Sequence, residues 1–211
     1  MMTALLPTGG PPPDPLDGSI GSDHGSTPDA FPRTSPRRAL LDTNVLLDHL
    51  MRRNDAAEHV TTMLKMCVLH DVTLLCASTS LKDIAYISEM MIRRQFGHMD
   101  ANTEARSEAS AGDRSPLEAA TIRMVTRRIP WHCVELARRI CDIVAIDQTT
   151  CDEAMLLRDR HDDFADDLII AAAHQSHCDV VITSDRKLIE HFPGHCVSPR
   201  RMTELLSAQN P

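Results

Sequence analysis

The chain has 211 residues, a net charge of −8 and a sequence pI of about 5.7. This length provides for one domain with a proper core, and the acidic balance argues against a protein that holds nucleic acid by bulk charge alone. The 7 cysteines are odd in number and lack zinc-binding spacing, so we expect reduced thiols in the core and no disulfides.

The first 36 residues differ in composition from the rest of the chain. They hold 8 of the 13 prolines and five of the 8 glycines. Because such a segment has too little apolar surface to offset its ordering entropy, we predict a disordered tail over 1–36 and a folded domain over 37–207. The start of the chain lacks the pattern of a secretory signal, and no later segment approaches a membrane span. We therefore expect a soluble cytoplasmic protein without a membrane partner.

Short apolar runs alternate with stretches of helical period through the folded part. This alternation is typical of an α/β fold in which helices cover a parallel sheet. The first run, 39–41, predicts a short buried strand that ends at Asp42. A helix is indicated around 60–68, and 72–76 is the second predicted strand.

The middle of the chain reads as helices separated by a polar segment. The run 78–80, Ser-Thr-Ser, predicts the start of a helix that ends near Gly97. The stretch 98–115 is polar and without period, so we expect a flexible loop inserted between helices. Pro116 then restarts the helical pattern, as is common at a first helical position. Two helical stretches follow, at 117–129 and 131–141.

The last third of the chain returns to alternating strands and helices. The predicted elements are a strand at 143–146, a helix near 151–157, an apolar helix that begins after the carboxylates at 162–167, a strand at 179–183, and a short strand near 196–197 before a helix at 199–207.

Four aspartates share one predicted position in this fold. Asp42, Asp83, Asp166 and Asp185 each follow the carboxyl end of a strand or lie at the start of a helix, which is the edge where parallel sheets form ligand sites. Clustered carboxylates raise one another's pKa, and a hard divalent cation relieves this conflict. Mg²⁺ or Mn²⁺ prefers such oxygen ligands, and it can activate water for attack on a phosphate ester.

Each of these residues also has a purely structural interpretation. Asp83 follows Ser80 by three residues and could complete a capping box, and Asp185 could be a turn residue. The helix dipole explains acids at 162–167, and for Asp163 and Asp167 we prefer that explanation. Asp42 is harder to explain in this way, because a carboxylate that closes a buried strand is costly to desolvate.

Other kinds of site find little support in the sequence. His174, His177 and Cys178 have the spacing of a helix end without a second group of ligands, so they are better read as core or surface residues. No nucleophile elbow accompanies a Ser-His-Asp or Cys-His set, and there is no glycine-rich phosphate loop. A phosphatase of the haloacid-dehalogenase type also needs a second aspartate two residues after Asp42, where Asn44 stands.

Four segments together resemble the PIN-domain family of ribonucleases. Over residues 38–207 they occur in the family's order and spacing: Leu-Leu-Asp-Thr-Asn at 40–44, Ser-Leu-Lys-Asp at 80–83, Asp-Phe-Ala-Asp-Asp-Leu at 163–168, and Val-Ile-Thr-Ser-Asp at 181–185. The departures are Asp83 in place of the usual glutamate, Ala165 in place of a common acid and Asp167 in place of a small residue. The register of the apolar residues that follow favours Asp166 as the acid of the third motif.

The resemblance implies a three-layer α/β/α fold with a central, mainly parallel sheet and Mg²⁺- or Mn²⁺-dependent cleavage of RNA. It makes metal ligands of Asp42, Asp83, Asp166 and Asp185, with Asn44 and either Thr183 or Ser184 orienting them or the attacking water. Asp42 and Asp166 are then the main ligands, Asp185 shares them, and Asp83 positions water or a second ion. The resemblance to VapC-type toxins further implies an antitoxin partner and a homodimer. The competing hypothesis is a catalytically silent PIN-like module that binds RNA or a protein.

Overall fold

The computed structural model describes residues 36–53, 55–104, 115–159 and 161–208. The predicted disordered tail lies outside these residues apart from Pro36. Within the described ranges the strands form one parallel sheet in the order β3-β2-β1-β4-β5. Its strands are β1 (Arg38–Leu41), β2 (Thr73–Ala77), β3 (Asp142–Val144), β4 (Val180–Ile182) and β5 (Cys196–Val197).

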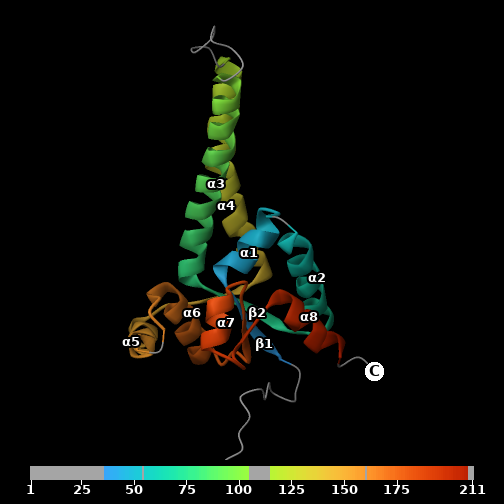
Figure 1. The fold of residues 1–211 in the computed structure, drawn as a ribbon, viewed down its shortest axis with the longest axis vertical. Helices are drawn as coiled ribbons and strands as arrows, with labels where there is room; N and C mark the ends of the chain where they lie inside the picture. Colours follow the sequence, from blue (N-terminus) through green and yellow to red (C-terminus); the bar gives the residue numbers. More distant parts are fainter. Residues whose placement is uncertain (1–35, 54, 105–114, 160, 209–211) are drawn as a thin grey trace, which may run out of the picture.

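Helices cover both faces of this sheet (Figure 1). They are α1 (Thr43–Leu50), α2 (Ala56–Leu69), α3 (Ser78–Glu104), α4 (Pro116–Ile140), α5 (Gln148–Leu157), α6 (Phe164–Gln175), α7 (Arg186–His191) and α8 (Pro199–Ser207). The side chains of β1 alternate, so that Ala39 and Leu41 pack with α1, α2 and α8 while Leu40 packs with α6 and α7. The predicted three-layer α/β/α fold is therefore confirmed.

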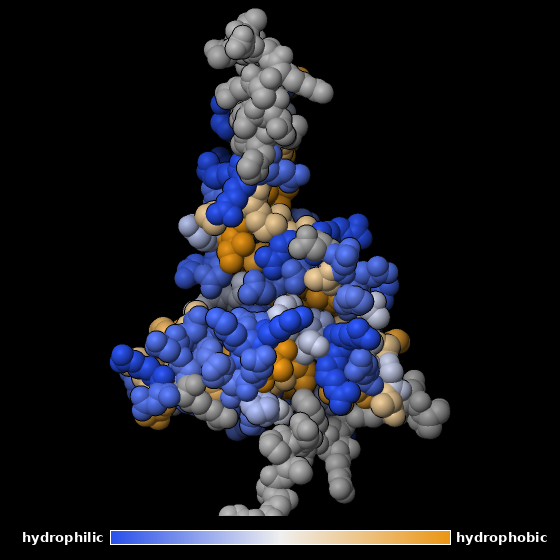
Figure 2. All heavy atoms as spheres, viewed as in Figure 1, coloured by the Kyte–Doolittle hydropathy of each residue, from blue (hydrophilic) through white to orange (hydrophobic). Residues whose placement is uncertain are grey.

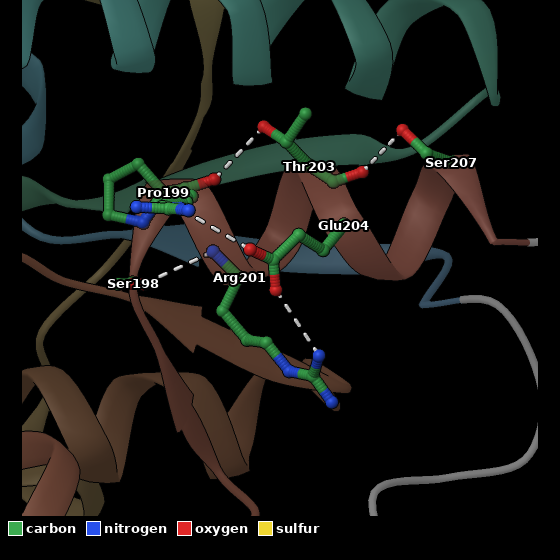
Figure 3. A network of polar contacts seen from close by, with 7 residues as sticks. Ser198, Pro199, Arg201, Thr203, Glu204 and Ser207 are labelled. Atoms are coloured by element: carbon green, nitrogen blue, oxygen red, sulfur yellow. Dashed lines mark hydrogen bonds and ion pairs between the residues drawn. The ribbon is translucent and has the colours of Figure 1, made fainter.

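Helix α8 is stabilised by local polar contacts on its exposed side and by a few buried side chains on the other. Ser198 caps its start by accepting a hydrogen bond from the backbone of Arg201 at 3.1 Å, and Glu204 accepts one from the Arg201 guanidinium at 3.3 Å (Figure 3). Met202 and Leu206 lie on the opposite side and are fully buried against the core. The boundaries agree with the sequence prediction of a helix at 199–207.

The predicted helix–loop–helix in the middle of the chain is corrected by the structure. Helix α3 does not end near Gly97 but continues to Glu104, so the first part of the expected loop is helical and 105–114 lies outside the described residues. An interior glycine costs a helix only about 1 kcal/mol, which packing against a partner helix can offset. The two stretches expected at 117–129 and 131–141 form the single helix α4, with Pro130 in its interior.

Helices α3 and α4 form a long antiparallel pair, which we call the arm, that projects away from the sheet (Figure 1). A capping box starts α4: Ser115 Oγ accepts from the backbone of Glu118 at 3.2 Å, and the Glu118 side chain accepts from the backbone of Ser115 at 3.1 Å. The base of α4 joins the core through Cys133 and Ala137. Within the described ranges, none of the helices combines the length and apolarity that a bilayer span requires.

The cysteines agree with the sequence prediction. All 7 lie in the described part of the chain and are free thiols, and most of them are buried.

Candidate active site

Asp42 occupies the carboxyl end of the central strand, where β1 gives way to α1. Its backbone amide donates a hydrogen bond to the carbonyl of Ile182 at 3.0 Å, which continues the pairing of β1 with β4. The residue is only 4% exposed. Because β1 and β4 are parallel neighbours, the residues that follow both strands meet at the same edge of the sheet.

One hydroxyl connects the acids that follow these two strands. The Thr183 hydroxyl is fully buried and donates to Asp42 Oδ2 at 2.8 Å. The oxygen of the Thr183 hydroxyl also accepts a hydrogen bond from the backbone amide of Asp185 at 3.0 Å. Asp185 in turn caps α7 by accepting from the backbone of Lys187 at 2.7 Å. Asp42 and Asp185 are thus held by a common partner.

Asp166, in the first turn of α6, belongs to the same group. Burial raises its pKa to about 6, and the charges of Asp42, Asp163 and Asp185 add to the rise, while His161 opposes it. Burial also raises the pKa of Asp42, and the charge of Asp185 acts in the same direction. The Thr183 hydrogen bond opposes that rise. The structure therefore brings three of the four predicted acids, Asp42, Asp166 and Asp185, into one electrostatically coupled cluster.

Asp83 is not coupled to this cluster. It lies near the start of α3, forms an ion pair with the neighbouring Lys82 at 3.2 Å, and has a side chain that is 37% exposed. Its charge is not among those that shift the pKa of Asp42 or Asp166. Ser80 lies inside the helix and accepts a hydrogen bond from the Thr43 hydroxyl at 2.9 Å, which ties the base of α3 to α1.

The two acids that flank Asp166 have different roles. Asp163 caps α6, because its side chain accepts hydrogen bonds from the backbones of Ala165 at 3.1 Å and Asp166 at 3.3 Å, as expected for a helix start. Asp167 does more than complement the helix dipole. It is 2% exposed and lies 2.9 Å from His161 Nδ1, a buried pair that the sequence analysis did not predict.

An open hollow of about 480 Å³ lies beside the cluster and shares Asp185 with it. Its other lining residues are Asn44, Asp48, Arg53, Ser184 and Arg186. The buried carboxylate of Asp48 holds two of these residues in place: Arg53 forms an ion pair with it at 2.8 Å, and the Ser184 hydroxyl donates a hydrogen bond to it at 3.3 Å. Arg53 also donates to the Asn44 carbonyl at 3.0 Å.

Sequence reasoning assigned no role to Asp48, Arg53 or Arg186, although they line the hollow. The signal that could have found Asp48 is a charged residue directly after Val45, Leu46 and Leu47, all of which are fully buried. A charge in such a run implies a partner, because an unpaired buried carboxylate is costly. Arg53 and Arg186 gave no comparable signal.

The chemistry of the donors fits a divalent cation. Among the described residues, no three His, Cys, Asp or Glu side chains lie together in a ready-made metal cage. Mg²⁺ does not require one, because it usually keeps several waters and binds through one or two carboxylates and substrate phosphates. Burial raises the pKa values of Asp42 and Asp166, and the charges of neighbouring carboxylates add to the rise, so a bound cation would stabilise both charged forms.

Comparison with known proteins gave one family and several solved structures. The profile of a family described as PIN domain matches residues 38–187. No curated protein sequence matches the chain. The crystal structure of PAE2754 from Pyrobaculum aerophilum is similar at a TM-score of 0.46 and 17% identity, covering 82% of this chain and 90% of that one.

Two further solved structures are similar to the chain. VapBC2 from Rickettsia felis, bound to a promoter DNA fragment, matches at a TM-score of 0.49 and 12% identity, over 76% of this chain and 98% of that one. A toxin–antitoxin complex from Klebsiella pneumoniae matches at a TM-score of 0.43 and 18% identity, over 76% of this chain and 97% of that one.

Proposed function

The chain belongs to the PIN-domain family, and from that premise we propose that it is a Mg²⁺- or Mn²⁺-dependent endoribonuclease that hydrolyses RNA phosphodiesters. The observation that carries the proposal is the coupling of Asp42, Asp166 and Asp185 at one edge of the parallel sheet. Three carboxylates that repel one another would destabilise the fold without a compensating function.

We assign the metal to these carboxylates, with Asp42 and Asp166 as the main ligands and Asp185 sharing them. The bound cation would activate a water and stabilise the charge that develops on the leaving oxygen. Thr183 fixes the orientation of Asp42 through its 2.8 Å hydrogen bond. Such a hydrogen bond, which orients a ligand from behind, is the usual task of a residue next to a metal ligand.

The remaining predicted residues would act around this centre. Asp83 lies outside the coupled cluster, so we assign it to positioning water or a second ion rather than to the main ion. Asn44 lines the adjacent hollow and would orient the substrate or the attacking water. The exposed guanidinium of Arg186, on the rim of the same hollow, would contact a neighbouring phosphate of the RNA.

The sequence resemblance to VapC-type toxins adds two partners to the proposal. An antitoxin would silence the nuclease by covering its acidic groove, and the chain would act as a homodimer. Coexpression with the product of an adjacent gene, followed by purification of a complex that no longer cleaves RNA, tests the antitoxin part. Light scattering of the chain by itself tests the dimer.

A catalytically silent PIN-like module that binds RNA or a protein is the second candidate. The observation that favours it is the lack of a three-residue metal cage among the described residues, together with the absence of Asp83 from the charges that shift the pKa of Asp42 and Asp166. Isothermal titration with Mn²⁺ separates the two candidates, because a nuclease must bind the ion and a silent module need not.

The direct test is to replace Asp42 by asparagine and to follow the cleavage of total RNA with Mg²⁺ or Mn²⁺, with and without chelator. We expect Asp42→Asn to reduce cleavage by at least about a hundredfold, because the amide cannot hold the ion as the carboxylate does. Asp162→Asn is the matched control, since Asp162 is exposed and its charge is not among those coupled to Asp166. Full activity of a folded Asp42→Asn variant would end the proposal.

A further inference from the structure

The solvent-exposed side of α4 carries an unusual combination of side chains along most of its length. We call this surface the arginine face, and it consists of Arg123, Arg127, Arg128, Trp131, Arg138 and Arg139, all of them exposed. Their spacing along the chain puts them on one half of a helix with 3.6 residues per turn. The opposite half contains the buried Cys133 and Ala137, which pack into the core.

The charge of α4 is opposite to that of the chain as a whole. Its sequence holds 5 arginines and 2 glutamates, whereas the complete chain has a net charge of −8. None of these arginines forms an ion pair with a described residue, unlike Arg93 on α3, which binds Glu89 at 2.7 Å. The excess of arginines over glutamates along this helix leaves a positive surface that favours an anionic partner.

Trp131 adds a stacking surface to this positive stripe. It is the single tryptophan of the chain, lies between Arg128 and Arg138, and is 71% exposed. An exposed indole offers a large apolar ring that can stack on another flat group. On the side of the arm that Figure 2 shows, hydrophobic residues lie among hydrophilic ones.

We propose that the arginine face is a docking surface for single-stranded RNA, with the arginines on successive phosphates and Trp131 stacked on a base. This inference rests on the proposed ribonuclease function and deepens it. Arginine beside an exposed aromatic ring is the combination that binds single strands without strong sequence preference.

The position of the arm explains why a nuclease would need such a face. The carboxylates at the sheet edge repel a polyanion before a cation is bound, and the net charge of the chain adds to the repulsion. The arm rises from that same edge, since α3 begins directly after β2 and Ser80 is bonded to Thr43 next to Asp42. RNA held on the arm would therefore be concentrated near the carboxylates.

The single tryptophan provides the first test. A mixed-sequence RNA of roughly 20 nucleotides is added to the full chain in the presence of EDTA, so that binding is followed without cleavage. We expect the RNA to quench the emission of Trp131, because a stacked base contacts the indole. Asp42→Asn should show the same quenching, and this separates a failure of binding from a failure of catalysis.

Charge variants provide the second test, with fluorescence anisotropy of labelled RNA as the measurement. Arg123→Ala, Arg127→Ala and Arg128→Ala combined should weaken binding about tenfold at about 0.1 M salt and lower the salt slope by about 2, as expected for three lost phosphate contacts on a single strand. The control combines Lys65→Ala, Arg158→Ala and Arg200→Ala, which removes the same charge from exposed positions on other elements. Trp131→Ala should weaken binding roughly fivefold or more.

Two results would overturn the inference. If RNA leaves Trp131 emission unchanged and the arm variant binds RNA as well as the control variant does, the face does not contact RNA. If Trp131→Ala converts a dimer into a monomer in light scattering while its RNA affinity stays that of the wild type, the face belongs to a second copy of the chain. Normal cleavage by a variant that no longer binds RNA through the arm would leave the ribonuclease proposal standing.

Discussion

The two neighbouring hydroxyl residues after β4 have separate tasks. Thr183 donates to Asp42 at 2.8 Å, whereas Ser184 donates to Asp48 at 3.3 Å on the side of the hollow. The sequence predicted that one of the two orients the site, but it could not say which. Successive residues of an extended chain point to opposite sides, and only the pairing of β4 with β1 shows that Thr183 faces Asp42.

The same limit applies to the acids themselves. Asp42, Asp166 and Asp185 could be predicted because each follows a strand or opens a helix at one edge of the sheet. That Asp83 is not coupled to them could not be predicted, because the coupling depends on how the start of α3 is placed against the sheet edge. The pairing of Asp167 with His161 could not be predicted either, because His161 precedes α6 in an irregular segment whose path the sequence pattern does not indicate.

Replacing Asp166 by asparagine should stabilise the metal-free protein. The folded-state pKa of about 6 lies above the ordinary value of 3.8. Above about pH 6 the charged carboxylate therefore destabilises the folded state. As the pH falls through 6 the carboxyl takes up a proton and this destabilisation is relieved. In EDTA at about pH 7.5 we expect Asp166→Asn to raise the free energy of unfolding by about 1–2 kcal/mol, a range that allows for solvent screening.

Urea denaturation at several pH values measures this effect. The gain should shrink toward zero near about pH 4, where the wild-type carboxyl is itself neutral in the folded protein. Asp162→Asn, an exposed neighbour, should show little change at any pH. A destabilised Asp166→Asn variant at about pH 7.5, or a gain that does not depend on pH, would contradict the assignment of excess charge to this cluster.

At the scale of elements, the strands were predictable, whereas the full extent of the two long helices and the existence of the shortest helices were not. The apolar runs that became β1, β2 and β5 were found at nearly their true limits. Helices α1 and α7 have 8 and 6 residues, too short to be stable by themselves, and they exist because the core packs against them. Tertiary packing likewise carries α3 past Gly97 and α4 through Pro130.

The contact of Arg53 with α1 should matter for stability as well as for the hollow. Asp48 is 7% exposed, and Arg53 holds it at 2.8 Å while also bonding the Asn44 carbonyl. Arg53→Met leaves a buried carboxylate without its cation, and we expect a loss of about 2 kcal/mol, less than for a fully buried pair because Arg53 is partly exposed.

A double-mutant cycle in urea distinguishes this from a general loss of packing. Asp48→Asn combined with Arg53→Met removes both charges, so it should recover about half of the loss caused by Arg53→Met. If the double variant is as unstable as the sum of the single variants, the pair is not coupled. The ion pair would then contribute nothing specific to the start of α1.

At the scale of the whole molecule, charge is separated into two regions. The coupled carboxylates lie at the sheet edge, and the arginine face lies along α4, which forms part of the arm. A net charge of −8 averages over both regions, so composition could exclude bulk attraction of nucleic acid but could not reveal the arginine face. The arrangement also leaves the metal-free protein with a repulsion that a cation should remove.

Metal binding should therefore appear as a gain in stability of the whole molecule. A ligand that binds only the folded state stabilises it by about 2.7 kcal/mol at a hundred times its Kd, which for a domain of this size is a rise in Tm of about 5–10 °C. We expect Mn²⁺ to produce such a rise in the wild-type chain and in Asp162→Asn, and to have little effect on Asp42→Asn. Differential scanning calorimetry in chelator-treated buffer measures it. An equal rise in Asp42→Asn would mean that the ion binds elsewhere. The absence of a rise in the wild type would favour the silent module, because the acids of a nuclease must hold an ion before they can act.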